Sequence, residues 1–366
     1  MAVKYLSGLR LTGTEAERLA LSGTTPDAVP QTSWKQLGKT TLGDDGTLTV
    51  SGFTAKDNLM VLGMYKSVSG NVTAGLKFNS NTDGEYASVS CLNGSSTEQL
   101  DTSGDCIQLD KNYGGSEWSF FITTIKNTLN QEKLCKSENN PNSDTGAGTA
   151  PNRIEAVGKW DNTDEQITTI QLTDKDGSTS QQWADGSEVV VLGMDDDEAD
   201  SGTNFWQELA NPTDLAVAGD TLDSGTFTAK DYLMVDVFRT RSSSVNSRIR
   251  VNGDDGEVYS HRNYGASNSY GNDSTTEDST SIHSHALTTN DSFTTYLIVN
   301  KLSKEKLMII HEINRNSTGN NVPARMEVVA KWANTNSAIT SINVINTDSG
   351  NLDVGTSIRV WGGTPT

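Results

Sequence analysis

APNRIEAVGKW, residues 150–160, returns later in the chain as VPARMEVVAKW, residues 322–332. Proline, arginine, glutamate, lysine and tryptophan recur in the same order and at the same spacing. Self-similarity at a fixed distance is the sequence signature of a repeated structural unit. We therefore expect one unit written twice, with Trp160 and Trp332 in equivalent places.

Other blocks repeat in the same register. FTAKD at 53–57 returns residue for residue at 227–231, and LMV at 59–61 returns at 233–235. Spacings drift only where Gly, Ser, Asn and Asp cluster, which is typical of loops between fixed strands. These boundaries predict four segments: an N-terminal arm at 1–31, a first repeat at 32–194, an acidic linker at 195–204 and a second repeat at 205–366.

Short apolar runs between polar turns dominate both repeats. Residues 47–50 alternate as a half-buried strand does, whereas residues 59–62 are continuously apolar and indicate a central strand. Neither repeat sustains a helical period; two helical turns are expected in the arm at 15–21. The pattern predicts an all-β fold of two tandem antiparallel β-sandwich domains, jelly-roll-like, with roughly eight strands each and a short N-terminal arm.

Composition limits the classes of partner. The 366-residue chain has a net charge of −19 and a mean hydropathy of −0.50. Such a surface repels phosphate backbones and anionic lipid, so neither nucleic acid nor a membrane is an expected partner. No apolar run reaches the roughly 18 residues that span a bilayer. The N-terminus lacks a signal-peptide core, which predicts synthesis in a cytoplasm without a signal peptide.

The cysteines are expected to be free thiols. Cys91, Cys106 and Cys135 all lie in the first repeat. A disulfide framework would be expected to recur with the fold, and none of the three has a counterpart in the second repeat.

No sequence constellation points to catalysis. The chain has no Gly-x-Ser-x-Gly elbow, phosphate-binding loop or His-Glu-x-x-His motif. The four histidines all lie in the second repeat, so the two units cannot share a catalytic histidine. We predict no catalytic residues, no cofactor and no enzymatic activity. A glycoside hydrolase with paired carboxylates stays open as an alternative.

The sequence contains two kinds of candidate metal site. His283 and His285 are alternate residues, which point to one face of a strand, and on a trimer axis three copies could surround one ion. Asp-rich turns at 174–177 and 252–256 carry oxygen ligands of the kind calcium prefers, although Asp-Gly pairs are also ordinary turns.

Two sets of exposed apolar residues are candidate contact surfaces. Aromatic residues near polar loops could stack on sugar rings or anchor a protein interface; they are Tyr113, Trp118, Tyr259, Tyr264 and Tyr270. The arm is too apolar to be left in water, which predicts a docking segment; its residues are Tyr5, Leu6, Leu9, Leu11, Leu19 and Leu21.

Several blocks together resemble the β-rich accessory virion proteins of tailed bacterial and archaeal viruses. They are VKYLSG at 3–8, PQTSWK at 30–35, LMV at 59–61, KFN at 77–79, Lys159-Trp160 and GSEV at 186–189. Members are non-enzymatic jelly rolls or related sandwiches, often trimeric, that decorate heads or form fibres and tail adhesins. The doubled domain departs from the single-domain form.

The resemblance implies a structural virion protein, either a capsid decoration or a fibre subunit. It also implies localisation in the virion, contacts with other capsid or tail proteins through the N-terminal arm, and a homo-oligomer, with a trimer favoured. A receptor- or glycan-binding adhesin that recognises a host glycan is the main alternative. A double jelly-roll capsid protein is a further one.

Overall fold

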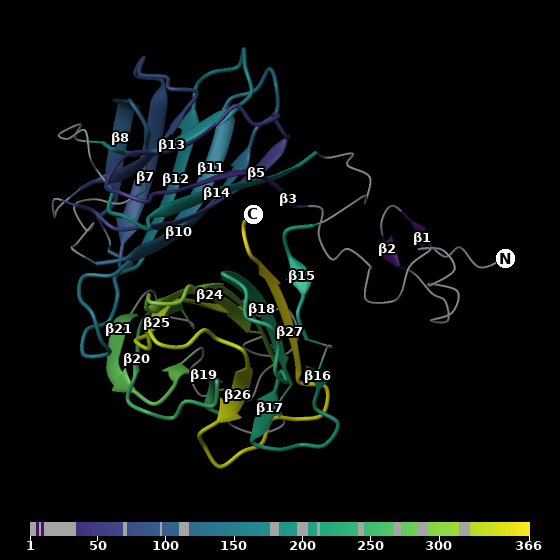
Figure 1. The fold of residues 1–366 in the computed structure, drawn as a ribbon. Helices are drawn as coiled ribbons and strands as arrows, with labels where there is room; N and C mark the ends of the chain where they lie inside the picture. The colour runs from purple at the N-terminus through teal and green to yellow at the C-terminus, as the bar shows by residue number, and fades with distance from the viewer. Residues whose placement is uncertain are drawn as a thin grey trace.

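The computed structural model describes most of both repeats and two short pieces of the arm (Figure 1). The described residues are 5–6, 9–10, 34–68, 72–95, 97–109, 117–175, 183–195, 204–210, 213–240, 245–266, 272–283, 291–314 and 323–366. In the arm, β1 (Tyr5–Leu6) pairs antiparallel with β2 (Leu9–Arg10). The expected helix at 15–21, with Leu19 and Leu21, lies outside the described residues, and so does Leu11.

The first repeat folds into two antiparallel sheets. The large sheet has the order β3 (Lys35–Thr41), β14 (Glu188–Met194), β5 (Asn58–Tyr65), β10 (Ser119–Lys126), β11 (Lys133–Pro141), β12 (Ile154–Trp160), β7 (Tyr86–Leu92) and β8 (Gln99–Gly104). The small sheet has the order β4 (Leu48–Ser51), β13 (Thr169–Asp174), β6 (Ala74–Phe78) and β9 (Ile107–Gln108). The continuously apolar β5 is a central strand, as its sequence predicts.

The second repeat copies this topology strand for strand. Its large sheet has the order β15 (Gln207–Glu208), β27 (Ser357–Gly363), β18 (Tyr232–Arg239), β23 (Ser292–Val299), β24 (Lys306–Asn314), β25 (Ala324–Trp332), β20 (Tyr259–Ala266) and β21 (Asn272–Ser279), and β16 (Thr213–Asp214) also pairs with β27. Its small sheet has the order β17 (Thr221–Asp223), β26 (Ile342–Asn346), β19 (Ser247–Val251) and β22 (Ile282–His283).

The fold is therefore all-β, with four antiparallel sheets that form two sandwiches. This confirms the predicted fold class. The first repeat has twelve described strands, β3 to β14, so the expectation of roughly eight strands per repeat was too low. Among the strands without a clear sequence signal are β8 and β9 and their counterparts β21 and β22. β8 and β21 are polar edge strands, and β9 and β22 are only two residues long, so none of them carries a clear alternating pattern.

Trp160 and Trp332 occupy matching positions at the ends of β12 and β25. Both indoles are buried in the core of their own sandwich. Each ring nitrogen donates a hydrogen bond to a carboxylate in the turn before the adjoining strand, Glu85 at 3.2 Å and Asp254 at 3.0 Å. The two tryptophans therefore share one environment, as the duplication predicts.

A lysine and a tyrosine accompany each tryptophan. The Nζ atom of buried Lys133 lies 6.0 Å from the Trp160 ring centroid, and that of Lys306 lies 5.7 Å from Trp332. The hydroxyls of Tyr86 and Tyr259 accept hydrogen bonds from backbone amides of β6 and β19, at 2.9 and 3.1 Å. Burial lowers the pKa of Lys306 to about 8. Duplication has preserved these polar contacts around the tryptophan as well as the apolar pattern of the core.

A third apolar core lies between the sandwiches, where the two large sheets pack through their outer faces (Figure 1). Its fully buried members come from both units: Leu62, Met64, Phe120, Ile122, Val190 and Leu192 from the first, and Tyr232, Val299, Leu307, Ile309 and Val329 from the second, with Phe205 and Trp206 beside them. The two units therefore form one body, because burial of apolar surface is the main driving force of association.

The described ends of the 195–204 segment are anchored. The Asp195 carboxylate accepts a hydrogen bond from Lys56 at 2.7 Å, and the Phe205 amide donates to the Trp34 carbonyl at 2.8 Å. Residues 196–203 lie outside the described part of the chain.

All three cysteines are free, as predicted. Burial raises the pKa values of Cys106 and Cys135 to about 12. The described residues contain no helix of the length and apolar character needed to cross a bilayer.

Candidate functional site: the cleft between the sandwiches

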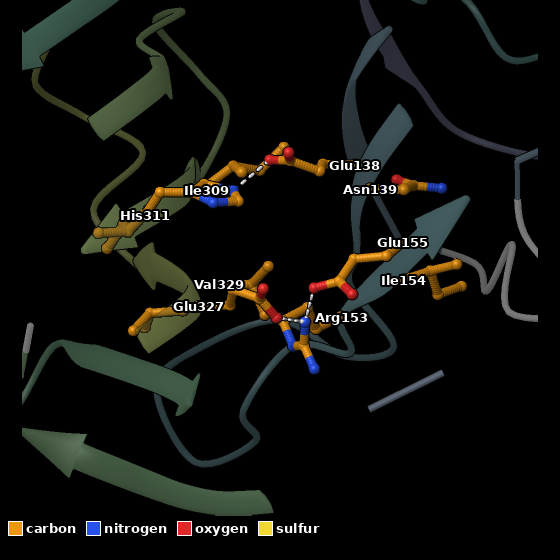
Figure 2. Close-up of a pocket in the computed structure, with 11 residues that line it drawn as sticks. Glu138, Asn139, Arg153, Ile154, Glu155, Ile309, His311, Glu327 and Val329 are labelled. Carbon is orange, nitrogen blue, oxygen red and sulfur yellow. Dashed lines mark hydrogen bonds and ion pairs between the residues drawn. The ribbon is translucent and has the colours of Figure 1, made fainter. Parts of the chain in front are cut away.

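A small cleft opens at the edge of the third core, between β11 and β12 of the first unit and β24 and β25 of the second (Figure 2). Its charged residues are Glu138, Arg153 and Glu155 from the first unit, with His311 and Glu327 from the second. Strand pairing positions these side chains. Glu138 lies directly opposite Glu155 on the neighbouring strand of one sheet, and His311 lies directly opposite Glu327 on the neighbouring strand of the other.

Arg153 is the centre of the cleft. Its guanidinium is buried, donates to the Glu327 carboxylate at 2.6 Å, and also pairs with Glu155. The same group lies 4.9 Å from the ring centroid of Tyr264. Arg325 pairs with the other Glu327 oxygen at 2.9 Å. Burial lowers the pKa of Arg153, and the charge of Glu327 opposes that shift.

The second ion pair joins Glu138 to the Nε2 atom of His311. Burial alone would lower the pKa of His311. The hydrogen bond to Glu138 and its negative charge, assisted by Glu327, outweigh burial and raise the pKa. The imidazolium form is therefore favoured in the folded chain.

Buried polar contacts continue past the cleft and join the two units. The side-chain amide of Asn140 donates to the backbone carbonyls of Met308 and Ala330 at 2.9 and 3.0 Å. Lys331, fully buried, donates to Asn142 at 3.0 Å and to the Asp144 carbonyl at 2.7 Å.

A second polar cluster lies at the other side of the third core. The Glu188 carboxylate accepts hydrogen bonds from the Tyr232 hydroxyl at 2.9 Å and from Lys301 at 2.7 Å. Burial would raise the pKa of Glu188, but the charge and hydrogen bond of Lys301 outweigh it and lower the pKa. Burial raises the pKa of Tyr232 well above its usual value.

These contacts determine what the cleft can do. Each charged residue that lines it in the described structure has a partner of opposite charge inside the cleft. Such an arrangement holds two bodies in one orientation, because breaking the buried Arg153–Glu327 pair would leave a poorly solvated charge. The cleft is therefore a joint between the sandwiches.

Three of the five predicted aromatic contact residues can be placed. The Lys304 ammonium lies 3.4 Å from the Trp118 ring centroid, and Trp118 packs against the third core. The Tyr264 ring lies against the Arg153 guanidinium, and Tyr259 is buried in the second sandwich. All three are used inside the chain. Tyr113 and Tyr270 lie outside the described residues.

The histidine candidates are only partly placed. His283 lies on β22, and its ring centroid is 6.2 Å from that of His261 on β20, while His285 lies outside the described residues. Burial lowers the pKa of His261 to about 3, and the nearby His283 and Arg248 add to the effect. Within the described ranges, no three His, Cys, Asp or Glu side chains group as metal ligands would.

The Asp-rich turn at 252–256 has a structural role. One Asp254 carboxylate oxygen accepts from the Trp332 indole, and the other accepts from the Gly256 amide at 3.0 Å. Of the turn at 174–177, residues 176 and 177 lie outside the described structure.

The repeated glutamates Glu155 and Glu327 both take part in ion pairs. The sequence does not show that Glu327 pairs with Arg153 of the other unit. The recurrence of Arg-x-Glu at 153–155 and 325–327 was the available signal. Spacing along a strand cannot show which unit supplies the partner.

Neither a protein-family model nor a curated protein matches this chain. Among solved structures, it is similar to the mouse laminin alpha1 chain, domains LG4-5, with 10% sequence identity and a TM-score of 0.20. That alignment covers 93% of this chain and 92% of the laminin chain. At this TM-score the likeness carries no argument about function.

Replacing His311 with glutamine should remove a pH-dependent contribution to stability. Because the folded-state pKa is raised, the ion pair stabilises fully below the unfolded pKa of about 6.5, and this contribution is lost as pH rises through the folded value. We expect His311→Gln to lower the free energy of unfolding by about 1 kcal/mol or less at pH 5.5, because both partners are partly exposed.

Thermal melts of both proteins at pH 5.5 and 8.5 test this. The difference between wild type and variant should shrink at the higher pH. Asp214→Asn, which removes the surface partner of Arg359, is the matched control and should show no such change. A His311→Gln effect that is the same at both pH values would contradict the assignment.

Proposed function

We propose that this chain is a non-enzymatic structural virion protein, a capsid decoration or fibre subunit built from a duplicated jelly-roll-like sandwich. The observation that carries the proposal is the third core, which joins the two sandwiches into one body. A building element must transmit force without changing shape, and an interface with an apolar core and charge pairs at its edge suits that task.

The sequence supplies the link to virus particles. The blocks at 3–8, 30–35, 77–79 and 186–189 carry the resemblance to accessory virion proteins. GSEV at 186–189 contributes Glu188, whose carboxylate joins the two units through Tyr232 and Lys301. One block of the resemblance thus coincides with the joint that makes the doubled unit rigid.

The described aromatic residues give the adhesin alternative little support. It rested on aromatic side chains near loops, and those that are described serve the core or the interdomain contact. No described feature specifically favours sugar recognition over a structural role.

Mass spectrometry of gradient-purified particles tests the proposal. The chain should be present in a fixed ratio to the major capsid protein and should co-sediment with intact particles. Washing in high salt should leave it attached if it is integral. A chain that is abundant in the infected-cell lysate but missing from purified particles would overturn the proposal.

A further inference from the structure

The outer face of each large sheet has two halves, which the duplication lets us compare position by position. We call one of them the Phe half. In the first unit it contains Met64, Phe120 and Asn140, which lie side by side on β5, β10 and β11. Its counterpart in the second unit holds Phe238, Phe293 and Ile313, side by side on β18, β23 and β24.

The Leu half lies further along the same strands. In the first unit it holds Leu134 and Val157, with Lys159 beside Leu134. In the second unit the matching residues are Leu307, Val329 and Lys331. The sequence repeat and the strand registers give the same correspondence.

Within the chain, the Phe half of the first unit packs on the Leu half of the second. Phe120 and Leu307 share the third core, and Asn140 donates to backbone carbonyls of β24 and β25. The Lys331 ammonium donates a hydrogen bond to the side chain of Asn142, which lies just past the end of β11. Two different surfaces of the same unit type therefore meet, so the contact is heterologous, or head-to-tail.

The two unused halves are exposed. Phe238, Phe293 and Ile313 are 41%, 43% and 50% exposed, whereas Met64, Phe120 and Asn140 are 0%, 1% and 0% exposed. Leu134 and Val157 are 58% and 56% exposed, whereas Leu307 and Val329 are 0% and 2% exposed. At these positions each open surface matches one that the chain buries in its other unit, whereas Val190 and Ile309 of the third core correspond to Arg359 and Lys136.

The open Leu half is also extended and concave. Val157 faces Val89, and Val89 faces Leu100, which is 74% exposed. These side chains and Leu134 line a shallow, mainly apolar hollow on β7, β8, β11 and β12. Exposed apolar surface of this kind marks interaction sites on soluble proteins.

A lysine–glutamate ion pair is likewise buried in the second unit and exposed in the first. Lys331 and Glu305 lie 3.9 Å apart, and both are covered by the segment after β11, since Glu305 accepts from Asn142 at 2.9 Å and from the Gly146 amide. Their counterparts, Lys159 and Glu132, form a 2.9 Å pair that is open to solvent. The first unit therefore presents the surface that the second uses to receive its neighbour.

We propose that copies of this chain associate head-to-tail, with the Phe half of the second unit of one chain packing on the Leu half of the first unit of the next. The contact would use the same two halves of the sheet as the interdomain contact. Heterologous contacts close into a ring or continue as a fibre, depending on the rotation between neighbours. This inference names the surfaces through which copies of the chain would associate. Its biological purpose rests on the proposed function.

The experiment uses the full chain and two double variants. Leu134→Glu with Val157→Glu places charge on the open Leu half, and Phe238→Glu with Phe293→Glu does so on the open Phe half. All four residues are exposed, so folding should be preserved, and circular dichroism melts check this. Leu302→Glu with Val217→Glu, at exposed positions of 63% and 76%, is the matched control.

Sedimentation velocity over a wide concentration series measures the outcome. Wild type and control should form oligomers whose size grows with concentration, more readily in higher salt because screening weakens the repulsion from a net charge of −19. Each double variant should weaken self-association by about 100-fold or more, because a buried unpaired charge opposes the contact.

Mixing the two double variants gives the decisive result. Each retains one intact half, so an equimolar mixture should form 1:1 heterodimers and nothing larger. Loss of association in the Leu-half variant alone would show that another segment, such as the N-terminal arm, occupies that surface, and would overturn the proposal. So would a self-associating Phe-half variant, or a wild type that stays monomeric throughout. A wild type that stays monomeric yet is present in purified virions would leave the proposed function standing and remove only this inference.

Discussion

Replacing either Trp160 or Trp332 with alanine is expected to lower the free energy of unfolding by about 3–5 kcal/mol. Both indoles are almost completely buried, and each fills the end of its sandwich core. Truncation removes the ring contacts, leaves a cavity, and strips a hydrogen-bond donor from a carboxylate. The two losses should be similar because the two environments match.

Chemical denaturation followed by circular dichroism measures these losses without depending on tryptophan fluorescence. Leu302→Ala, at an exposed position, is the control and should change the free energy of unfolding by about 0.5 kcal/mol or less. A large loss for one tryptophan and almost none for the other would contradict the equivalence of the two units.

Replacing Glu312 with alanine is expected to cost about 3–5 kcal/mol, because it leaves a buried arginine without its carboxylate. The Arg239 side chain is fully buried and donates to Glu312 at 3.2 Å, to Thr294 at 2.6 Å and to the Tyr296 hydroxyl at 2.7 Å. Asp214→Ala, which breaks the exposed pair with Arg359, should cost about 1 kcal/mol or less.

The first unit indicates how this loss can be repaired. At the positions of Arg239 and Glu312 it carries Tyr65 and Asn139, joined by a 2.9 Å hydrogen bond from the amide to the hydroxyl. We expect Arg239→Tyr with Glu312→Asn to be clearly more stable than Glu312→Ala, because an uncharged pair replaces an orphaned charge. A double variant as unstable as the single one would show that the two cores cannot exchange this pair.

The fold was largely predictable because the repeat and the alternating strands report local backbone geometry. The sequence block that ends in Trp160 is repeated at Trp332, and the two tryptophans have matching environments in the structure. The missed strands β9 and β22 are two residues long, which is too short for a period to be visible.

The joint between the sandwiches was much less predictable. One signal existed: β24 carries Leu307 and Ile309 on its outer face, where β11 carries Leu134 and Lys136. Within one chain, only the second unit buries this half of its sheet. The sequence alone does not show which surface covers this half of the sheet. Inside the second sandwich, the partners of Arg239 come from other strands, and they cannot be assigned until the strand registers are known.

Small-angle X-ray scattering from dilute full-length protein tests whether the two sandwiches form one body through their outer faces. We expect the scattering of a single compact particle. Its radius of gyration, extrapolated to zero protein concentration, should lie near the value of about 21 Å for a globular chain of this length, with an addition for the arm. A curve that requires two separated bodies on a flexible tether would contradict it.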